Sequence, residues 1–248
     1  MALFLHICLA YIKKKLYLCA LLRVIMRIAL IGYGKMGHMI EEVALERGHE
    51  IVARIDVGDA FDLKNAEVAI EFTTPATAEM NIRKAWEQNI PVICGSTGWR
   101  PEELRVEGLE LREVNSRKLI VDSKTGKTML VWSSNFSVGV NIFFELNKEL
   151  AQKMSDQPQY TPSITETHHI HKLDKPSGTA KTLAEEIKMS RSRDVEITSI
   201  REGEVPGTHE VKWDSEEDTI IITHIAKGRR GFALGAVLAA EHLKSCAG

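Results

Sequence analysis

The stretch RIALIGYGKMGHMIEEVALERGHEIVARID, residues 27–56, decides the fold of this chain. Its first five residues, RIALI, are mainly apolar and predict a buried strand, which the glycine turn GYGKMG connects to an amphipathic segment. That segment predicts a helix that stops at Gly48, because glycine commonly follows the last turn of a helix. A second apolar strand, EIVARID, ends at Asp56. Residues 27–56 therefore predict a strand, a turn, a helix and a second strand.

The glycine turn has the spacing GxGxxG, formed by Gly32, Gly34 and Gly37. This spacing alone is weak evidence, but here it lies between a strand and a helix, and Asp56 follows 19 positions after Gly37. In that context Gly32 permits a tight turn, Gly34 lets the backbone approach a pyrophosphate, and Gly37 allows close helix–strand packing. The stretch predicts a dinucleotide-binding Rossmann unit. The alternative is a similar turn that binds nothing, or another nucleotide.

Charged residues of the same unit bear on which dinucleotide binds. Asp56 is expected to accept hydrogen bonds from the ribose hydroxyls, which disfavours a 2′-phosphate and favours NADH. Arg54, two residues earlier, could partly offset this charge, so NADPH stays open. Lys35 could lie near the phosphates or be an ordinary surface lysine. Tyr33 and Met36 complete the turn residues expected at the cofactor.

Strand-like and helix-like segments keep alternating up to Trp99. EVAIEFT, ATAEMNIRKAWEQN and PVICGST predict a strand, a helix and a further strand, and this alternation is typical of a doubly wound parallel sheet. The loops FTTP (72–75) and GSTG (95–98) each follow a strand, at the edge where such sheets bind ligands. Either could be a plain loop. Together they are expected to line a nicotinamide ribose pocket through Thr73, Gly95, Ser96 and Thr97.

Beyond Trp99 the pattern changes. LIVDSKTGKTMLVWSS, residues 119–134, predicts two strands around a Lys-Thr-Gly turn, and the later strands and helices are no longer interleaved. This predicts a second, α+β domain. The expected organisation is an extension outside the fold (1–25), a dinucleotide-binding domain (26–132), a substrate-binding and oligomerisation domain (133–238) and a shortened C-terminal end that returns toward the first domain (239–248).

Composition excludes some partners. Of the 248 residues, 44% are hydrophobic and 27% are charged, which is ordinary for a soluble globular protein. A net charge of −2 gives no overall attraction to nucleic acid or to an anionic membrane. The four cysteines form no CxxC pair, which fits a reducing compartment, and we expect a cytoplasmic protein.

Residues 1–25 contain two short apolar runs interrupted by three consecutive lysines, at positions 13–15. A signal peptide carries its positive charge before one apolar stretch, and a membrane helix needs about 20 predominantly apolar residues. The segment fits neither pattern, and Met26 opens a natural protein start. We interpret residues 1–25 as an upstream extension, with a membrane-associating or targeting segment as the alternative.

A second informative stretch, ETHHIHKLDKPSGTA, occupies residues 166–180 and holds three histidines in four positions. A metal site, an acid–base site, an anion site and a polar loop without a role are the candidates. His168, His169 and His171 cannot easily all converge on one ion, and no cysteine or carboxylate motif of familiar spacing stands nearby. We therefore predict no metal site.

Acid–base chemistry and anion binding explain more of this stretch. Ser177 is a plausible helix cap, while Gly178 and Thr179 offer backbone N–H groups and a hydroxyl for a carboxylate-sized anion. A histidine and Lys172, a few residues upstream, add donors, and histidine can transfer a proton near neutral pH. The two halves of the chain together predict the reduction of an anionic, nitrogen-containing substrate by a nicotinamide.

The same stretch closely resembles the signature of the dihydrodipicolinate reductases of lysine and diaminopimelate biosynthesis. The resemblance spans about residues 26–242, and GYGKMG, EFTTPATAEMN, VICGSTGW, SSNFSVGVN, REGEVPGTHEV and THIAKGRRGFALGAV resemble the family's successive blocks. It implies hydride transfer to the dihydrodipicolinate precursor, a small dicarboxylate, with loss of water. It also implies a Rossmann domain and a substrate domain whose sheet builds a homotetramer.

The resemblance also implies residue roles. His168 matches the family's proton donor and acceptor, and Lys172 a second proton donor. His169, Gly178 and Thr179 match positions that bind the substrate carboxylates, beside the Ser177 cap. Positions that match the cofactor site are Gly32, Tyr33, Gly34, Lys35, Met36, Gly37, Asp56, Gly95, Ser96, Thr97, Ser133, Ser134, Asn135 and Phe136.

Three features depart from the family's pattern. Residues 99–133 are longer than expected, as if a hairpin were inserted; the C-terminus stops early, which could expose apolar surface; and residues 1–25 have no counterpart. Three alternatives stay open: a non-catalytic dinucleotide sensor, a metal-dependent enzyme that uses the histidines, and a protein tethered to a membrane by residues 1–25.

Overall fold

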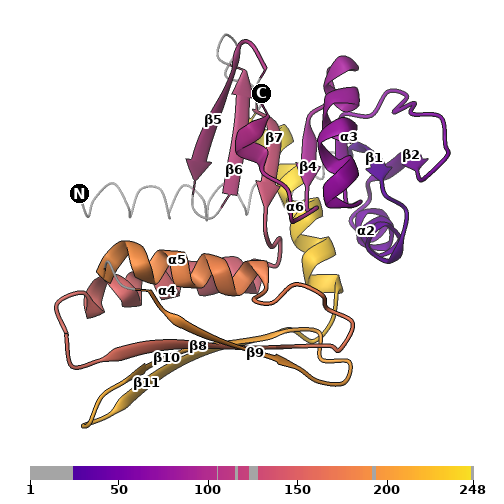
Figure 1. The fold of residues 1–248 in the computed structure, drawn as a ribbon. Coiled ribbons are helices and arrows are strands. Elements are labelled where there is room, and N and C mark those ends of the chain that lie inside the picture. The colour runs from indigo at the N-terminus through magenta and orange to yellow at the C-terminus, as the bar shows by residue number, and fades with distance from the viewer. Residues whose placement is uncertain (1–24, 105, 115–116, 123–127, 192–193, 247–248) are drawn as a thin grey trace.

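Two β-sheets organise the chain, a seven-stranded sheet and a four-stranded sheet (Figure 1). The computed structural model describes residues 25–104, 106–114, 117–122, 128–191 and 194–246. The sheets belong to successive parts of the chain, so the expected Rossmann-type sheet with a second α+β unit is confirmed.

The larger sheet has the strand order β2-β1-β3-β4-β7-β6-β5. Its parallel part begins with the predicted unit, because β1 pairs with β2 on one side and with β3 on the other. The rest of the sheet is antiparallel, because β6 pairs antiparallel with both β7 and β5. The bounds are β1 Arg27–Ile31, β2 Glu50–Ile55, β3 Val68–Glu71, β4 Val92–Cys94, β5 Leu109–Val114, β6 Arg117–Asp122 and β7 Thr128–Ser133.

The unusual stretch after Trp99 thus extends this sheet. A short 3-10 helix, Pro101–Glu103, leads into β5, and the three strands β5, β6 and β7 form an antiparallel meander at the sheet's edge. The two strands predicted for residues 119–134 are confirmed as β6 and β7. The turn predicted between them falls at 123–127, outside the described residues.

Helices cover both faces of the larger sheet. Helix α2, Lys35–Glu46, packs on one face and α3, Pro75–Glu87, on the other. Helix α2 ends as predicted, since Gly48 has a φ of +85° and its amide donates to the Leu45 carbonyl at 2.9 Å. These layers hold the carboxyl ends of β1, β3 and β4 at one edge.

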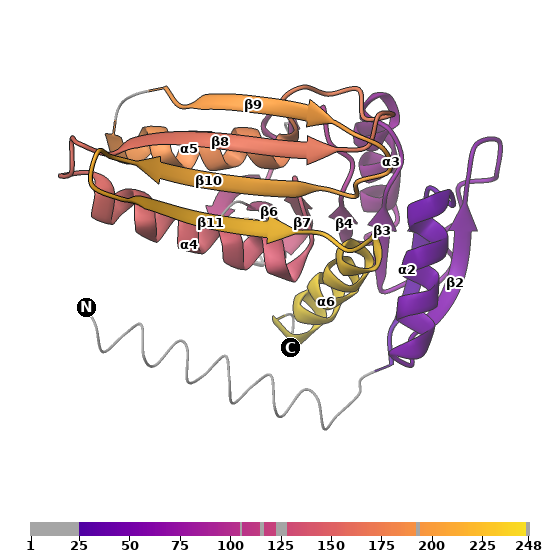
Figure 2. The same ribbon diagram turned by 90° about the horizontal axis from the view of Figure 1, so that it is seen from below.

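The C-terminal helix α6, Arg230–Cys246, returns to the face that α2 covers (Figure 2). The return was expected only from residue 239, and this bound is wrong, because the helix that returns begins at Arg230. Ala233, Ala236 and Val237 are fully buried in the core shared with α2 and β1. The helix carries an alanine-rich stripe, which lets it lie close to the sheet.

The smaller sheet has the order β11-β10-β8-β9, with β8 and β9 parallel and the other pairs antiparallel. Two helices, α4 and α5, lie side by side on one face and enclose a core around Trp213 and Phe144 (Figure 1). No described element covers the opposite face. The bounds are α4 Val138–Met154, β8 Thr161–His168, α5 Gly178–Arg191, β9 Glu196–Arg201, β10 Thr208–Asp214 and β11 Thr219–Ile225.

Within the described ranges, no helix has the length and apolar character needed to cross a bilayer. The interpretation of residues 1–25 as an extension, or as a membrane segment, concerns positions that lie outside those ranges apart from Ile25.

Candidate active site

A cleft separates the edge of the larger sheet from the first turn of α5. Two adjoining cavities form it, of about 460 Å³ and about 700 Å³, and both are lined by Met36 after the glycine turn and by Gly178 at the start of α5. Phe72, Gly95 and Ser134 also line both cavities. The cleft therefore joins the predicted nucleotide half of the chain to the predicted substrate half.

The glycine turn lies at the carboxyl end of β1, and its packing requires glycine at two positions. Gly32 has a φ of +92°, and a Cβ there would lie 2.3 Å from the Phe72 carbonyl oxygen. A Cβ on Gly37 would lie 2.4 Å from the Gly32 carbonyl oxygen. By contrast, nothing lies within 4 Å of a Cβ position on Gly34, so its backbone is open to a ligand. This cradle fits the pyrophosphate of a dinucleotide.

Asp56 follows β2 directly and lies beside this turn. The Gly32 amide donates to the Ile55 carbonyl at 2.8 Å, which fixes the end of β2 against the turn. The Asp56 side chain is exposed and accepts a hydrogen bond from the Val57 amide at 2.9 Å. Its carboxylate is thus available at the position where a Rossmann unit binds an adenosine ribose.

The two loops predicted at the nicotinamide are joined by a buried carboxylate. The Thr73 amide donates to Ser96 Oγ at 2.8 Å and to Glu71 Oε1 at 3.1 Å. Glu71 is fully buried and also accepts a hydrogen bond from Cys94 Sγ at 3.0 Å. Burial, with the Glu71 carboxylate beside it, raises the pKa of the Cys94 thiol, which therefore stays protonated and donates. Glu71 fixes both loops.

The segment after β7 bridges the two halves of the cleft. Ser133 Oγ donates to the Asn135 carbonyl at 2.8 Å, and Asn135 Nδ2 donates to Thr179 Oγ1 at 3.2 Å. Phe136 is buried and its ring lies 6.1 Å from that of Phe72, centroid to centroid. The first turn of α5 is thereby tied to the end of the larger sheet.

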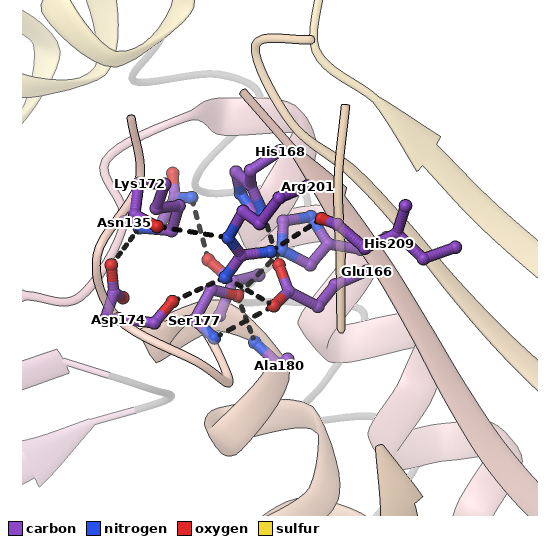
Figure 3. A network of polar contacts seen from close by, with 11 residues as sticks. Asn135, Glu166, His168, Lys172, Asp174, Ser177, Ala180, Arg201 and His209 are labelled. Atoms are coloured by element: carbon purple, nitrogen blue, oxygen red, sulfur yellow. Dashed lines mark hydrogen bonds and ion pairs between the residues drawn. The ribbon is translucent and has the colours of Figure 1, made fainter. Parts of the chain in front are cut away.

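Glu166 is the centre of the polar network in the substrate half (Figure 3). Its Oε2 forms an ion pair with His168 Nδ1, two residues along β8, and its Oε1 accepts from Arg201 Nη2 at 3.0 Å. The same Oε1 accepts from the Ser177 amide at 3.3 Å. The carboxylate is fully buried, with Arg201 and the Ser177 amide on one oxygen and the His168 ring against the other.

Ser177 begins α5 as predicted. Its Oγ accepts from the Ala180 amide at 3.2 Å and lies 3.2 Å from His209 Nε2, while its carbonyl accepts from the Lys181 amide. Because the hydroxyl is engaged by these partners, Ser177 holds the helix start, and Gly178 and Thr179 line the cavity. The start of a helix attracts anions through its free N–H groups.

Lys172 lines the same cavity as this helix start. Its Nζ forms an ion pair with Asp174 Oδ1 at 2.7 Å, and its backbone carbonyl accepts from Arg201 Nε at 3.2 Å. Burial raises the pKa of Asp174, but the hydrogen bond and charge of Lys172, with the backbone and the Arg201 charge, together lower it below its usual range. Asp174 therefore stays charged and holds the ammonium at the cavity.

The histidine next to Glu166 is tuned by opposing effects. Burial lowers the pKa of His168, while the Glu166 carboxylate raises it and Lys172 lowers it; the net shift is downward. Burial, and then His168, lower the pKa of His209 to about 3. The two rings meet edge to face, with centroids 5.0 Å apart. His209 therefore stays neutral, and His168 is left as the ring that can exchange a proton with the cavity.

The residues that could bind a metal in the structure differ from the three neighbouring histidines considered on the sequence. Glu166, His168 and His209 bring possible ligand atoms within 4.8 Å of one another, whereas His171 is exposed and pairs with Glu204 at 3.3 Å. Both Glu166 oxygens already contact cationic or N–H groups. This donor set fits an acid–base relay better than a cation site.

Two family models match the chain in succession. The N-terminal domain of dihydrodipicolinate reductase matches residues 26–136, and the C-terminal domain of the same enzyme matches residues 139–248. The chain belongs to the dihydrodipicolinate reductase family. The junction at 136–139 lies close to the boundary expected at 132–133, and the C-terminal match includes α6.

Similar proteins of this reductase family cover nearly the whole chain. A 4-hydroxy-tetrahydrodipicolinate reductase from Christiangramia forsetii is 43% identical and covers 90% of this chain and 94% of its own length. One from Thermosipho africanus is 34% identical and covers 88% of this chain and 91% of its own. The family's Rossmann domain makes this chain a nicotinamide-dinucleotide-binding oxidoreductase.

Solved structures agree with the fold. Dipicolinate-bound dihydrodipicolinate reductase from Paenisporosarcina sp. TG-14 has a TM-score of 0.63 at 19% identity, over 90% of this chain and 96% of that one. Aspartate semialdehyde dehydrogenase II from Vibrio cholerae has a TM-score of 0.53 at 14% identity, over 89% and 99%. At such identities the likeness concerns the fold alone.

The reductase cleft gathers most of the residues singled out from the sequence. The turn residues other than Met36, and Asp56, do not line the two cavities; they lie at the ends of β1 and β2 beside them. Predicted residues that line the cleft are Met36, Thr73, Gly95, Ser96, Thr97, Ser133, Ser134, Asn135, Phe136, His168, His169, Lys172, Ser177, Gly178 and Thr179.

Four residues of this reductase site were missed: Glu71, Glu166, Arg201 and His209. One of them had a signal, because Glu166 and His168 are two residues apart and so share one face of a strand. The others had none: Arg201 and His209 come from β9 and β10 and reach the site through strand pairing. Glu71 contacts Thr73 and Cys94 only once β3 and β4 lie side by side.

Proposed function

We propose that the chain catalyses the reduction of 4-hydroxy-tetrahydrodipicolinate to tetrahydrodipicolinate in lysine and diaminopimelate biosynthesis. The net reaction transfers a hydride from NADH or NADPH, takes up one proton and releases one water. One observation carries the proposal for the site: the Glu166–His168 pair, Lys172 and the start of α5 face one cleft, whose other wall is the predicted nicotinamide pocket. The family membership supports the same reaction.

The dinucleotide would lie along the edge of the larger sheet, where its nicotinamide supplies the hydride. The turn from Gly32 to Gly37 would hold the pyrophosphate and Asp56 the ribose hydroxyls, because the first offers an open backbone and the second an exposed carboxylate. The loops held by Glu71, with Thr73 and Gly95–Thr97, would position the nicotinamide end. Residues 133–136 would close the pocket from the other side.

The substrate carboxylates would bind at the start of α5. Gly178 and Thr179 offer N–H groups and a hydroxyl there, and His169 lines the same cavity. The substrate class is supported by the solved relative that binds dipicolinate, itself a dicarboxylate.

We assign proton transfer to His168 and Lys172. The Glu166 carboxylate contacts His168 Nδ1, which leaves Nε2 of that ring for the cavity and stabilises the imidazolium when it forms. Lys172 carries a second acidic proton, and Asp174 holds its ammonium in place. The two donors lie on one segment, residues 168–172.

We propose that the chain has two domains. Residues 26–132 and α6 would form the dinucleotide-binding domain, and the chain from 133 to the end of β11 would form the substrate domain.

NADH is proposed as the preferred cofactor because of Asp56. A homotetramer built through the smaller sheet is proposed because its outer face is uncovered among the described elements. A cytoplasmic location stays a prediction from the cysteine pattern.

Turnover tests the reaction and the site together. Oxidation of NADH and then NADPH is followed with freshly generated substrate for the wild type, His168→Ala and Lys172→Ala. Each variant should lose roughly 10²–10⁴-fold in kcat, the range for removal of a positioned acid, and should still bind the dinucleotide. His171→Ala is the matched control, because this neighbouring histidine is exposed and points to Glu204; it should keep full activity.

The other outcomes are informative. Tight dinucleotide binding by a wild type that turns nothing over would favour the sensor alternative. Inhibition of turnover by a chelator would favour the metal alternative. Full activity of both alanine variants would contradict the assignment of His168 and Lys172, and the reaction would then need another proton donor.

A further inference from the structure

A cluster of three side chains lies at the adenosine end of the predicted dinucleotide site. Tyr33, in the glycine turn, donates its hydroxyl to Glu41 on α2, and Arg54 on β2 donates to the same carboxylate. Arg54 Nε lies 3.1 Å from both Glu41 oxygens, and Nη2 forms the ion pair. The Arg54 guanidinium carbon lies 5.8 Å from the centroid of the Tyr33 ring.

The position of Arg54 makes this cluster relevant to the ribose. Side chains two residues apart in an extended strand point to the same side, so Arg54 and Asp56 share one side of β2 and the residue that follows it. The hydrogen bond from Gly32 to Ile55 holds that end of the strand against the turn. Arg54 is the cationic side chain of β2, and it therefore lies near the position where Asp56 would bind the ribose 2′-hydroxyl.

Glu41 is well placed to hold this cation. Its side chain is only 13% exposed, against 43% for Arg54, so a sheltered carboxylate holds a more exposed guanidinium. The hydrogen bond from Arg54 lowers the pKa of Glu41, which keeps the carboxylate charged at neutral pH. A paired guanidinium has lost its net charge and one of its donor edges to the partner.

We infer that Glu41 is a specificity-determining residue, which selects against a 2′-phosphate by holding Arg54 in an ion pair. The inference deepens the proposed function and rests on its dinucleotide site. With Glu41 present, a 2′-phosphate would meet the Asp56 carboxylate and a neutralised arginine. Without it, the same arginine would be free to bind the phosphate with two parallel hydrogen bonds.

Binding of two adenosine fragments tests this inference without any turnover. Calorimetry gives the dissociation constants of ADP-ribose and 2′-phospho-ADP-ribose for the full chain. The wild type should prefer ADP-ribose. Glu41→Gln, which keeps the shape and removes the charge, should shift the affinity ratio toward the 2′-phospho ligand by roughly 10-fold, the effect of one charge-assisted hydrogen bond.

Two further variants make the result specific. Glu42→Gln removes the same charge from the next position of α2, where the carboxylate pairs with Arg230 at 3.0 Å, and should leave the ratio unchanged. The double variant Glu41→Gln/Arg54→Met should lose the gain seen in Glu41→Gln alone. Those two results together would assign the effect to the Glu41–Arg54 pair.

Opposite results would overturn the inference. A weaker affinity of Glu41→Gln for 2′-phospho-ADP-ribose would mean that Glu41 presents Arg54 to the phosphate. An unchanged ratio, with ADP-ribose still bound, would mean that the pair only joins α2 to β2. A wild type that binds neither fragment would instead contradict the dinucleotide site of the proposed function, and the inference with it.

Discussion

At the scale of single residues, Glu166 shows how a buried charge is accommodated for chemistry. Burying a carboxylate is costly unless hydrogen bonds and counter-charges compensate it. Burial raises the pKa of Glu166, but hydrogen bonds from Ser199 and Arg201 outweigh it, so the pKa lies below its usual range. A carboxylate with a lowered pKa lies beside His168 Nδ1 and restricts the orientation of that ring.

We therefore expect Glu166→Gln to act through the position and the pKa of His168. The shape is kept, but His168 loses the carboxylate that raises its pKa, so that pKa should fall further below its usual value. The limb of the pH–rate profile that reports His168 should move to lower pH. The loss of kcat should fall short of the ~10²–10⁴-fold expected for removal of the acid itself. Steady-state kinetics across pH 5–9 measure both.

The control for this variant is Glu204→Gln, which removes the partner of the exposed His171 and should leave the profile in place. A lower rate with an unmoved limb would show that Glu166 only supports the fold. Unfolding by urea, measured in parallel, separates this outcome from a loss of folded protein, since Arg201 would lose its buried counter-ion.

At the scale of elements, the first turn of α5 combines a helix cap with the proposed site of substrate recognition. Capping by Ser177 leaves the backbone at Gly178 free to face the cavity. The hydroxyl also meets His209, which is neutral because burial lowers its pKa to about 3. One serine thus links the helix start, the buried histidine and, through its amide, Glu166.

Ser177→Ala should lower the free energy of unfolding by about 1 kcal/mol, within the roughly 0.5–2 kcal/mol range for removal of a helix cap. It should raise KM more than it lowers kcat, because the helix start is the proposed binding site of the substrate carboxylate and His168 is untouched. Urea unfolding and steady-state kinetics measure the two effects. Ser190→Ala, in the last turn of the same helix, removes a hydroxyl that donates to the Glu186 carbonyl at 3.5 Å and should change neither. An unchanged KM in Ser177→Ala would contradict the role of this turn in substrate binding.

At the scale of the whole molecule, the smaller sheet has two different faces. One is covered by α4 and α5, whereas the outer face presents Ile221 and Ile225, which are 50% and 66% exposed. The strand alternation places both on the side away from Ile222, which packs in the core. Exposed β-branched residues on an uncovered sheet favour association with other copies.

We expect the proposed tetramer to assemble through this face, so Ile221→Lys/Ile225→Lys should reduce its mass in solution to that of a smaller species. Two charges on the outer face would be buried without partners in the assembly. Size-exclusion chromatography with light scattering measures the mass. Leu45→Lys, an exposed leucine on α2, is the control and should leave the tetramer intact. A wild type that is monomeric, or a double variant with unchanged mass, would contradict assembly through this face.

Local patterns were sufficient for most of the larger sheet. The strand–turn–helix–strand unit of residues 27–56, the stop at Gly48 and the hairpin strands at 119–134 all depend on neighbours in sequence, and all were predicted correctly. The family signature likewise located the substrate half of the cleft. The start of the returning segment was predicted at residue 239, nine residues too late, because an alanine-rich helix face does not indicate which sheet it packs on.

The sequence by itself determined the Rossmann unit, the family and the segment that holds His168, Lys172 and Gly178, since these are encoded by short periodic patterns. Only the tertiary structure decided which residues complete the site. His209 pairs with Glu166 across β10 and β8, and Arg201 pairs with His168 across β9 and β8. These contacts join residues 33 to 43 positions apart, and they exist because strand register brings the same faces together. Register depends on the whole core and its loops, so no local pattern carries it.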